Sequence, residues 1–248
     1  MAQDDHKRIH GRDDAVEYYT PLYIMDAVRG VLGGIDYDPA SNALANELVQ
    51  ATNYSTDPGY VDFIQPIDKS LIGRIGALPT IVNPLPYRFF HDGGLSDWWH
   101  GRVWLNHPFG RDEKACKAGY LCTKKGCIKR GYHLASDKAG SYRWISRLVR
   151  AYEFGSSPGN LVHRGVTAAA TITFANTDAN WFRLLLPYPQ VYLYNRVNFM
   201  IPDNNGGLKK SNGVSKGAVI TFFGCDVDTI YQQFKAIGEL KLSYKGSK

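Results

Sequence analysis

Several large protein classes are excluded by what this sequence lacks. Its longest apolar runs, such as residues 218–223, are no longer than a strand, whereas a membrane-spanning helix needs roughly 20 residues. The first residues are charged and contain no apolar stretch of the kind found in a secretory signal peptide. There is no Gly-x-x-x-x-Gly-Lys-Ser/Thr phosphate loop, so nucleotide hydrolysis has no support. We therefore expect a soluble, cytoplasmic protein.

Cysteine is also scarce, and the few cysteines are unevenly placed. The chain has 4 cysteines in 248 residues, and three of them fall in one basic segment. Hydrophobic residues make up 44% of the chain and aromatic residues 13%, which indicates a packed core. The net charge of +6 is compatible with nucleic acid as a partner. The length fits one α/β domain with insertions.

Helical and strand patterns alternate along most of the chain. Thr20 and Pro21 suit the N-cap and first position of a helix near residues 23–32. Further helices are predicted at 142–154, 180–186 and 226–238, and strands at 35–38, 103–105, 161–162, 171–174, 191–194, 197–201 and 219–223. The alternation predicts a single α/β domain over 1–248 with a Rossmann-like sheet and an antiparallel hairpin toward the C-terminus. Two insertions are expected, at 60–88 and at 111–135.

The apolar run Val103-Trp104-Leu105 ends abruptly in a polar, rigid loop. The loop is Asn106-His107-Pro108-Phe109, and it brings an amide, two main-chain carbonyls and a ring to the carboxyl end of a strand. In open α/β sheets ligands bind at such ends. An amide oxygen and a carbonyl can both accept hydrogens from the exocyclic amine of a flipped base, while the ring stacks on it. The alternative is a common Asn-x-Pro turn that has only a structural role.

Several short motifs follow one another in an order that resembles a known family. They are Glu17-Tyr18-Tyr19-Thr20-Pro21, Asp36-Tyr37-Asp38-Pro39-Ala40-Ser41, Asp92-Gly93-Gly94-Leu95, Trp98-Trp99-His100 leading into Gly101–Gly110, Thr177–Phe182, Arg196–Phe199 and Gly217–Gly224. Each motif is weak alone. In this order, over most of the chain, they resemble the phage-type Dam-like DNA N6-adenine methyltransferases.

The resemblance implies a methyltransferase with S-adenosylmethionine as cofactor and DNA as partner, in the cytoplasm of a bacterial or phage-infected cell. The implied cofactor-binding residues are Tyr19, Thr20, Pro21, Asp38, Pro39, Ala40, Ser41 and, as the candidate ribose-binding acid, Asp92. Adenine N6 would donate to Asn106 Oδ1 and to the carbonyl of His107, with Phe109 stacked on the base. Positioning and electrostatic complementarity supply the rate without a covalent intermediate.

One position departs from the family pattern. The family has two prolines after the acidic or amide residue, and the first of them is His107 here. The main-chain carbonyl is the group that is needed, and Pro108 still favours an extended backbone at His107. The His107 side chain can instead contact the base or a phosphate, or it can mark a weakened enzyme. Two alternatives stay open: methylation of cytosine N4, and a DNA-binding protein without activity.

The basic insertion contains a second constellation. Cys116, Cys122, Cys127 and His133 follow one another at spacings of x5, x4 and x5. Three thiols and an imidazole can close a tetrahedral zinc site, and a cytoplasmic location argues against disulfides. The alternative is a set of free cysteines in a surface loop. The family resemblance does not cover this insertion. If zinc binds, we expect a structural site that folds a small basic module for DNA contact.

Overall fold

A computed structural model of the protein describes residues 18–56, 62–63, 87–88, 93–116, 124–130, 132–155, 165–203, 207–211 and 214–243. Asp92, Cys122, most of the expected insertion at 60–88 and the strand expected at 161–162 lie outside these residues. Within the described part of the chain, no helix is both long and apolar enough to cross a membrane.

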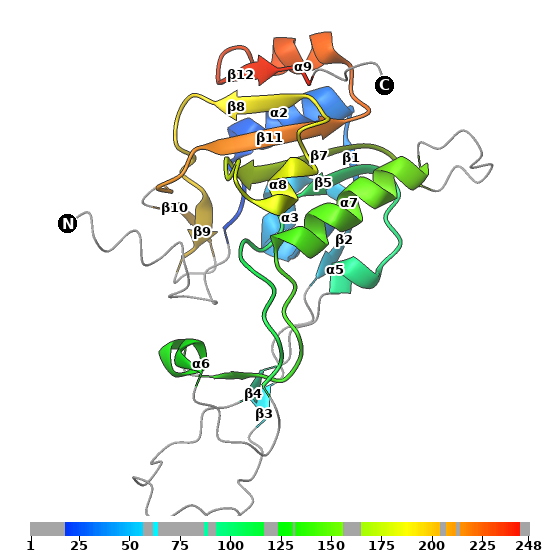
Figure 1. The fold of residues 1–248 in the computed structure, drawn as a ribbon. Helices are drawn as coiled ribbons and strands as arrows, with labels where there is room; N and C mark the ends of the chain where they lie inside the picture. Colours follow the sequence, from blue (N-terminus) through cyan, green and yellow to red (C-terminus); the bar gives the residue numbers. More distant parts are fainter. Residues whose placement is uncertain are drawn as a thin grey trace, which may run out of the picture.

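The described elements form a mixed α/β fold around a seven-stranded sheet (Figure 1). In spatial order its strands are β12 (Gly238–Lys241), β8 (Gln190–Leu193), β11 (Ala218–Phe223), β7 (Val166–Phe174), β5 (Gly101–Leu105), β1 (Ile35–Ser41) and β2 (Ala51–Thr56). The pairs from β2 through β1 and β5 to β7 are parallel. β11 runs antiparallel to both β7 and β8, and β12 is antiparallel to β8. This arrangement is compatible with the expected Rossmann-like sheet.

Helices cover both faces of the sheet because its strands are apolar on both sides. In β11, Ile220 and Phe222 join one hydrophobic core while Val219 and Phe223 join the other. The first core includes α2 (Leu22–Leu32) and α9 (Val227–Phe234), and α3 (Ala43–Val49) borders it. The second core includes α7 (Ser141–Gly155) and α8 (Asn180–Arg183). The helices expected in these regions are thus confirmed, with α8 and α9 shorter than predicted. The strands are confirmed too, but β1 runs on to Ser41, and of the strand expected at 197–201 only the last two residues are in a strand.

The start of α2 differs from the prediction by one residue, for a reason that matters below. Pro21 is the N-cap, with extended backbone (ψ 149°), and its carbonyl accepts from the amides of Ile24 and Met25. Thr20 is therefore outside the helix and does not cap it. Its hydroxyl lies instead within hydrogen-bond distance of Asn106 Nδ2.

An antiparallel hairpin lies toward the C-terminus, but it does not join the two strands expected there. β9 (Met200–Pro202) pairs with β10 (Leu208–Lys210), which lies within the segment expected to be a polar loop. The strand at 219–223 belongs to the central sheet. β10 was not predicted because, apart from Leu208, its residues are lysines that give no alternating apolar pattern.

The two expected insertions meet in one small sheet. β3 (Asp62–Phe63) pairs with β4 (Tyr87–Arg88), and β4 runs parallel to β6 (His133–Leu134). With α6 (Lys125–Arg130) this sheet lies away from the central sheet (Figure 1). Segments that sequence patterns present as separate insertions therefore form one substructure.

Candidate functional site

The candidate site lies where the order of strands reverses. From β1 the chain moves outward to β2, whereas β5 and β7 lie on the other side of β1. β1 and β5 are direct neighbours, with Tyr37 opposite Val103. In open α/β sheets this reversal is the place where ligands bind, beyond the carboxyl ends of the strands. Of the two polar segments singled out in the sequence, Asn106–Phe109 follows β5, whereas Asp38–Ser41 forms the second half of β1, where the pairing with β2 is irregular.

In the middle of β1, a carboxyl group is buried with no cation among its described partners. Asp38 is 2% exposed, and its Oδ1 accepts a hydrogen bond of 3.0 Å from the amide of Ala40. Ser41 is its other described partner, and burial raises the pKa of Asp38 to about 7. A carboxylate in such a place is costly unless a positive group approaches it.

The second half of β1 is held by a close backbone contact. A Cβ on Gly94, in α5 (Gly93–Ser96), would lie 1.7 Å from the carbonyl oxygen of Pro39. Only glycine allows the two backbones to approach in this way. The sequence motif Asp92-Gly93-Gly94-Leu95 includes Gly94 but did not indicate that it contacts Pro39.

The segment before α2 reaches both loops. Tyr19 forms an antiparallel bridge with Met200, with two backbone hydrogen bonds of 2.8 Å. Its hydroxyl accepts from Nδ2 of Asn42, at 3.1 Å, in the loop after β1. The ring of Tyr18 meets Phe199 edge to face, with centroids 6.1 Å apart. The bridge and these contacts anchor the segment that precedes α2.

Asn106 is oriented by this same segment. Its Nδ2 donates to the carbonyl of Tyr18 at 2.9 Å and lies 3.3 Å from the hydroxyl oxygen of Thr20. A carbonyl can only accept, so the nitrogen side of the amide must face Tyr18. Oδ1 therefore points the other way, and it accepts no hydrogen bond from any residue that the structure describes. The amide is therefore held in one orientation, and Oδ1 can accept a further hydrogen bond.

His107 turns its side chain inward. The imidazole is 1% exposed and burial lowers its pKa to about 4, so it is neutral near neutral pH. Nδ1 lies 2.9 Å from the carbonyl of Pro108 and must carry the proton, which leaves Nε2 without a partner among the described residues. The ring contacts Phe109 and Trp181 edge to face. A buried ring is not placed to contact a phosphate, so that option for His107 is not supported.

The aromatic residue of the loop is only partly available for stacking. Phe109 is half-buried, and its ring packs on Phe174 with centroids 4.5 Å apart and an interplanar angle of 32°. Pro108 beside it is exposed. Trp181 thus packs against His107 and Phe174 against Phe109. The sequence did not indicate that these two residues support the loop.

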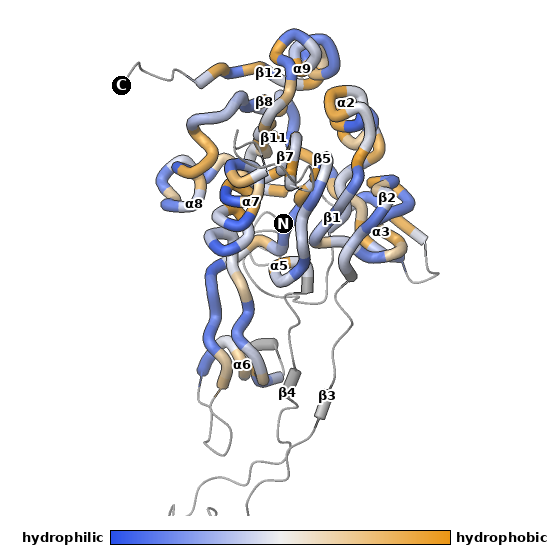
Figure 2. The backbone as a smooth tube through the Cα atoms, turned by 90° about the vertical axis from the view of Figure 1, so that its right-hand side faces the viewer, coloured by the Kyte–Doolittle hydropathy of each residue, from blue (hydrophilic) through white to orange (hydrophobic). Residues whose placement is uncertain are grey.

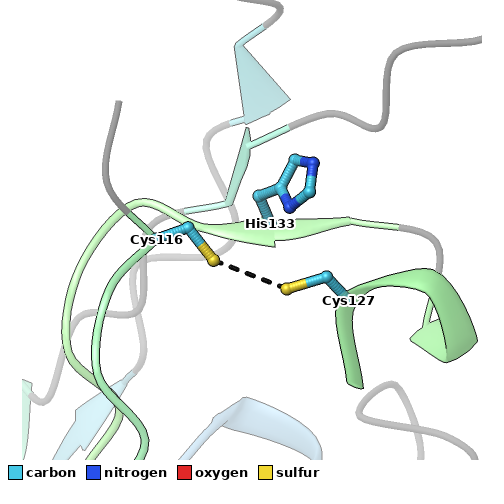
Figure 3. Close-up of side chains that lie close together, drawn as sticks. All are labelled: Cys116, Cys127 and His133. Carbon is cyan, nitrogen blue, oxygen red and sulfur yellow. Dashed lines mark hydrogen bonds between the residues drawn. The ribbon is translucent and has the colours of Figure 1, made fainter. Parts of the chain in front are cut away.

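The structure also brings together three of the four residues predicted to bind metal. The Sγ atoms of Cys116 and Cys127 are 3.4 Å apart, and both lie within 4.8 Å of a ring nitrogen of His133 (Figure 3). They come from three elements: the segment after the Asn106 loop, α6 and β6. The sulfur separation is too long for a disulfide. This cluster can hold a metal ion.

Comparison of the chain with protein families, with curated proteins and with solved structures gives no match. What the chain does is therefore inferred from its own residues.

Proposed function

We propose that the protein is an S-adenosylmethionine-dependent DNA methyltransferase that acts on adenine N6. The observation that carries the proposal is the fixed amide of Asn106 at the carboxyl end of β5. An exocyclic amine has two hydrogens to donate, and its recognition needs acceptors held in place. Asn106 Oδ1 is such an acceptor, and the neighbouring carbonyl of His107 is the second. The position between β1 and β5 is where a cofactor and a base would meet.

In the proposed reaction, Oδ1 of Asn106 and the carbonyl of His107 each accept one hydrogen of N6. S-adenosylmethionine, when bound, supplies a methyl group that its sulfonium activates. As the bond from N6 to the methyl carbon forms and the carbon–sulfur bond breaks, positive charge develops on N6. The two oxygens stabilise this charge, and one N6 proton then leaves to water. Because Nδ2 is fixed by Tyr18, little reorganisation accompanies the step.

The cofactor would lie between the segment 18–21 and the loop 38–41. Asp38 supports this placement, because it is a buried acid to which no described cation contributes. S-adenosylmethionine carries positive charge on its sulfonium and amino groups, which would compensate a buried carboxylate. Asp92, the proposed ribose-binding acid, lies outside the described residues. The cytoplasm of a bacterial or phage-infected cell remains the proposed place of action.

We further propose that zinc is the ion for the cluster of Cys116, Cys127 and His133. Two thiolates and an imidazole are a donor set that zinc prefers, and Cys122 would complete a closed structural site. Zinc–sulfur bonds of about 2.3 Å in a tetrahedron place two sulfurs about 3.8 Å apart. The observed separation of 3.4 Å is close to that value.

The test is to incubate DNA with the protein and methyl-labelled S-adenosylmethionine, digest it, and analyse the nucleosides by mass spectrometry. We expect labelled N6-methyladenine from the wild type. The Asn106→Ala variant should lose about 10²–10³-fold in rate while cofactor affinity changes little. Asn53→Ala, at an exposed position on β2, is the matched control and should keep full activity.

Each other outcome has a distinct meaning. Labelled N4-methylcytosine would keep the chemistry and overturn the choice of base, since the same two acceptors fit that amine. Unlabelled DNA, with cofactor binding shown by calorimetry, would refute DNA as the methyl acceptor. Absence of cofactor binding would refute the proposal as a whole.

A further inference from the structure

One segment leaves the Asn106 loop directly, turns at a distance from the sheet, and returns to α7. We call residues 111–140 the arm. The arm has eight Lys and Arg residues against three Asp and Glu residues, so it holds five of the six net positive charges of the chain before any metal and its thiolates are counted. Its connecting segments are largely hydrophilic (Figure 2). So large a share of the charge on one extension points to an anionic partner.

The base of the arm is tied to the loop that carries Asn106. The amide of Ser141 donates to the carbonyl of Gly110 at 3.0 Å, and the amide of Gly140 donates to Oδ1 of Asp112 at 2.7 Å. Glu113 and Lys138 form an antiparallel bridge with two backbone hydrogen bonds. The outgoing and the returning segment of the arm are therefore joined to each other next to the candidate base site.

Among the described side chains of the arm, the buried hydrophobic cluster is small. It consists of Cys116, Cys127, Tyr132 and Leu134. Small units with few apolar contacts are commonly stabilised by a metal or a disulfide. Two of the four members are the thiols that face each other. A metal ion bound to them would join α6, β6 and the outgoing segment, which explains why cysteines occupy this core.

The acidic groups of the arm are engaged within it, and basic groups remain exposed. Asp112 accepts from Gly140, while Asp137 pairs with Lys114 and accepts from Ala115 at 2.9 Å. Exposed cations among the described side chains of the arm include Arg111, Lys114, Lys124 and Lys125. They occupy both the base and the tip. Such spacing of cations fits an extended polyanion better than one small anion.

We propose that the arm is a metal-dependent clamp for the phosphate backbone of DNA. Zinc held by Cys116, Cys127 and His133 folds its tip, and the exposed lysines and arginines then bind phosphates beside the adenine that enters the Asn106 site. The choice of DNA as partner rests on the proposed function. The clamp positions the duplex and carries no sequence information itself, because phosphates are alike in every sequence.

The first experiment tests the metal. The full-length protein is stripped with a chelator and titrated with cobalt, whose visible spectrum reports thiolate ligands. We expect one equivalent to bind with thiolate bands, and zinc to displace it. In the Cys127→Ser variant the thiolate bands should weaken or vanish. A spectrum without thiolate bands in the wild type would overturn the metal site.

The second experiment measures DNA affinity against salt concentration. The double variant Lys124→Gln/Lys125→Gln should lower the slope of log K against log salt by about 1.8, the value for two lost phosphate contacts. Lys235→Gln/Lys241→Gln removes the same charge from α9 and β12, at the other end of the molecule (Figure 1), and should leave the slope unchanged. Equal effects of the two variants would overturn the clamp, as would tighter binding of RNA than of DNA.

Failure of the clamp and failure of the proposed function give different results. Removing the metal should weaken DNA binding at least tenfold while affinity for S-adenosylmethionine stays within twofold. If methyl transfer to DNA does not change when the metal or the lysines are removed, the proposed clamp is wrong and the proposed enzyme activity stands. Metal-dependent DNA binding without any methyl transfer would keep the clamp and refute the enzyme.

Discussion

The side-chain amide of Asn106 donates to the main-chain carbonyl of Tyr18, which lies 88 residues earlier in the chain. This bond joins the end of β5 to the segment before α2, and it decides which way the amide of Asn106 points. The bridge between Tyr19 and Met200 fixes that segment in turn. The orientation of one side chain thus depends on three parts of the chain, and the predictions below test this dependence.

Thr20 provides a graded test of how the amide is held. Thr20 is 2% exposed and its hydroxyl lies near Asn106 Nδ2, so Thr20→Val removes one contact and leaves the Tyr18 carbonyl in place. We expect kcat for methyl transfer to fall about tenfold, corresponding to about 1.4 kcal/mol, with a smaller effect on KM for DNA. Thr167→Val, at an exposed threonine on β7, is the control. A kcat unchanged in Thr20→Val would show that Tyr18 alone positions Asn106.

The neutral state of His107 predicts a loss of stability in acid. Burial lowers its pKa to about 4 from 6.5, so between these values the unfolded chain binds a proton that the folded protein does not. Stability therefore falls as the pH drops through this window. His107→Asn keeps a donor for the Pro108 carbonyl without titrating. Between about pH 7 and about pH 5 the wild type should lose about 2 kcal/mol more than this variant, or several degrees of Tm.

Thermal melts at the two pH values check this expectation. His100→Asn changes a partly exposed histidine and should behave like the wild type. If His107→Asn and the wild type lose the same Tm in acid, the imidazole is not buried as a neutral group. Methyl transfer by His107→Asn should persist, because the acceptor at this position is the main-chain carbonyl.

The sequence was sufficient to single out the two polar segments of the site but not what holds them. β5 is a short apolar strand, and its end before Asn106-x-Pro108 could be read from local patterns. β1 instead continues through Asp38-Pro39 to Ser41, where the local pattern predicted a loop. The contacts of Tyr19 with Met200 and of Gly94 with Pro39 depend on chain segments that meet only in the folded protein. Thr20 resembled a helix cap because capping and tertiary contact use the same hydroxyl.

The metal cluster also shows what residue spacing can and cannot predict. Spacing suggested Cys116, Cys127 and His133 as ligands, and the structure brings them together. Spacing could not show that β4, from the other insertion, pairs with the strand that carries His133. Pairing between two-residue strands leaves no periodic signal in the sequence. That the two insertions form one substructure could therefore be seen only in the folded protein.

Asp38 predicts that cofactor affinity depends on pH. Its pKa is raised to about 7 by burial, so the protein without cofactor holds a proton on this group at pH values where the unfolded chain has lost it. Stability of the unliganded protein should fall as the pH rises between about 4 and about 7. A cationic ligand prefers the ionised carboxylate, so affinity for S-adenosylmethionine should rise through the same range and level off above it.

Calorimetry on two variants separates this effect from general changes of charge. Asp38→Asn keeps the acceptor for the Ala40 amide and should melt higher than the wild type at neutral pH while binding the cofactor at least tenfold more weakly. Asp228→Asn, at an exposed position of α9, should match the wild type in both respects. Equal affinity at all pH values would mean that Asp38 does not face the cofactor's charge.

Gly94 tests whether α5 holds the second half of β1, which we call the Pro39 loop, in its binding form. An added Cβ would meet the Pro39 carbonyl at 1.7 Å, and since the carbonyl is backbone, either α5 or β1 must move. We expect Gly94→Ala to cost about 1–3 kcal/mol of stability and to weaken cofactor binding more than DNA binding, because the clamp is on a different segment. Gly217→Ala adds the same methyl group where no atom lies within 4 Å and should change neither property. Loss of DNA binding as large as the loss of cofactor binding would instead indicate that the variant unfolds as a whole, which circular dichroism would detect. Normal cofactor affinity in a folded Gly94→Ala protein would show that the loop at Pro39 is not part of the cofactor site.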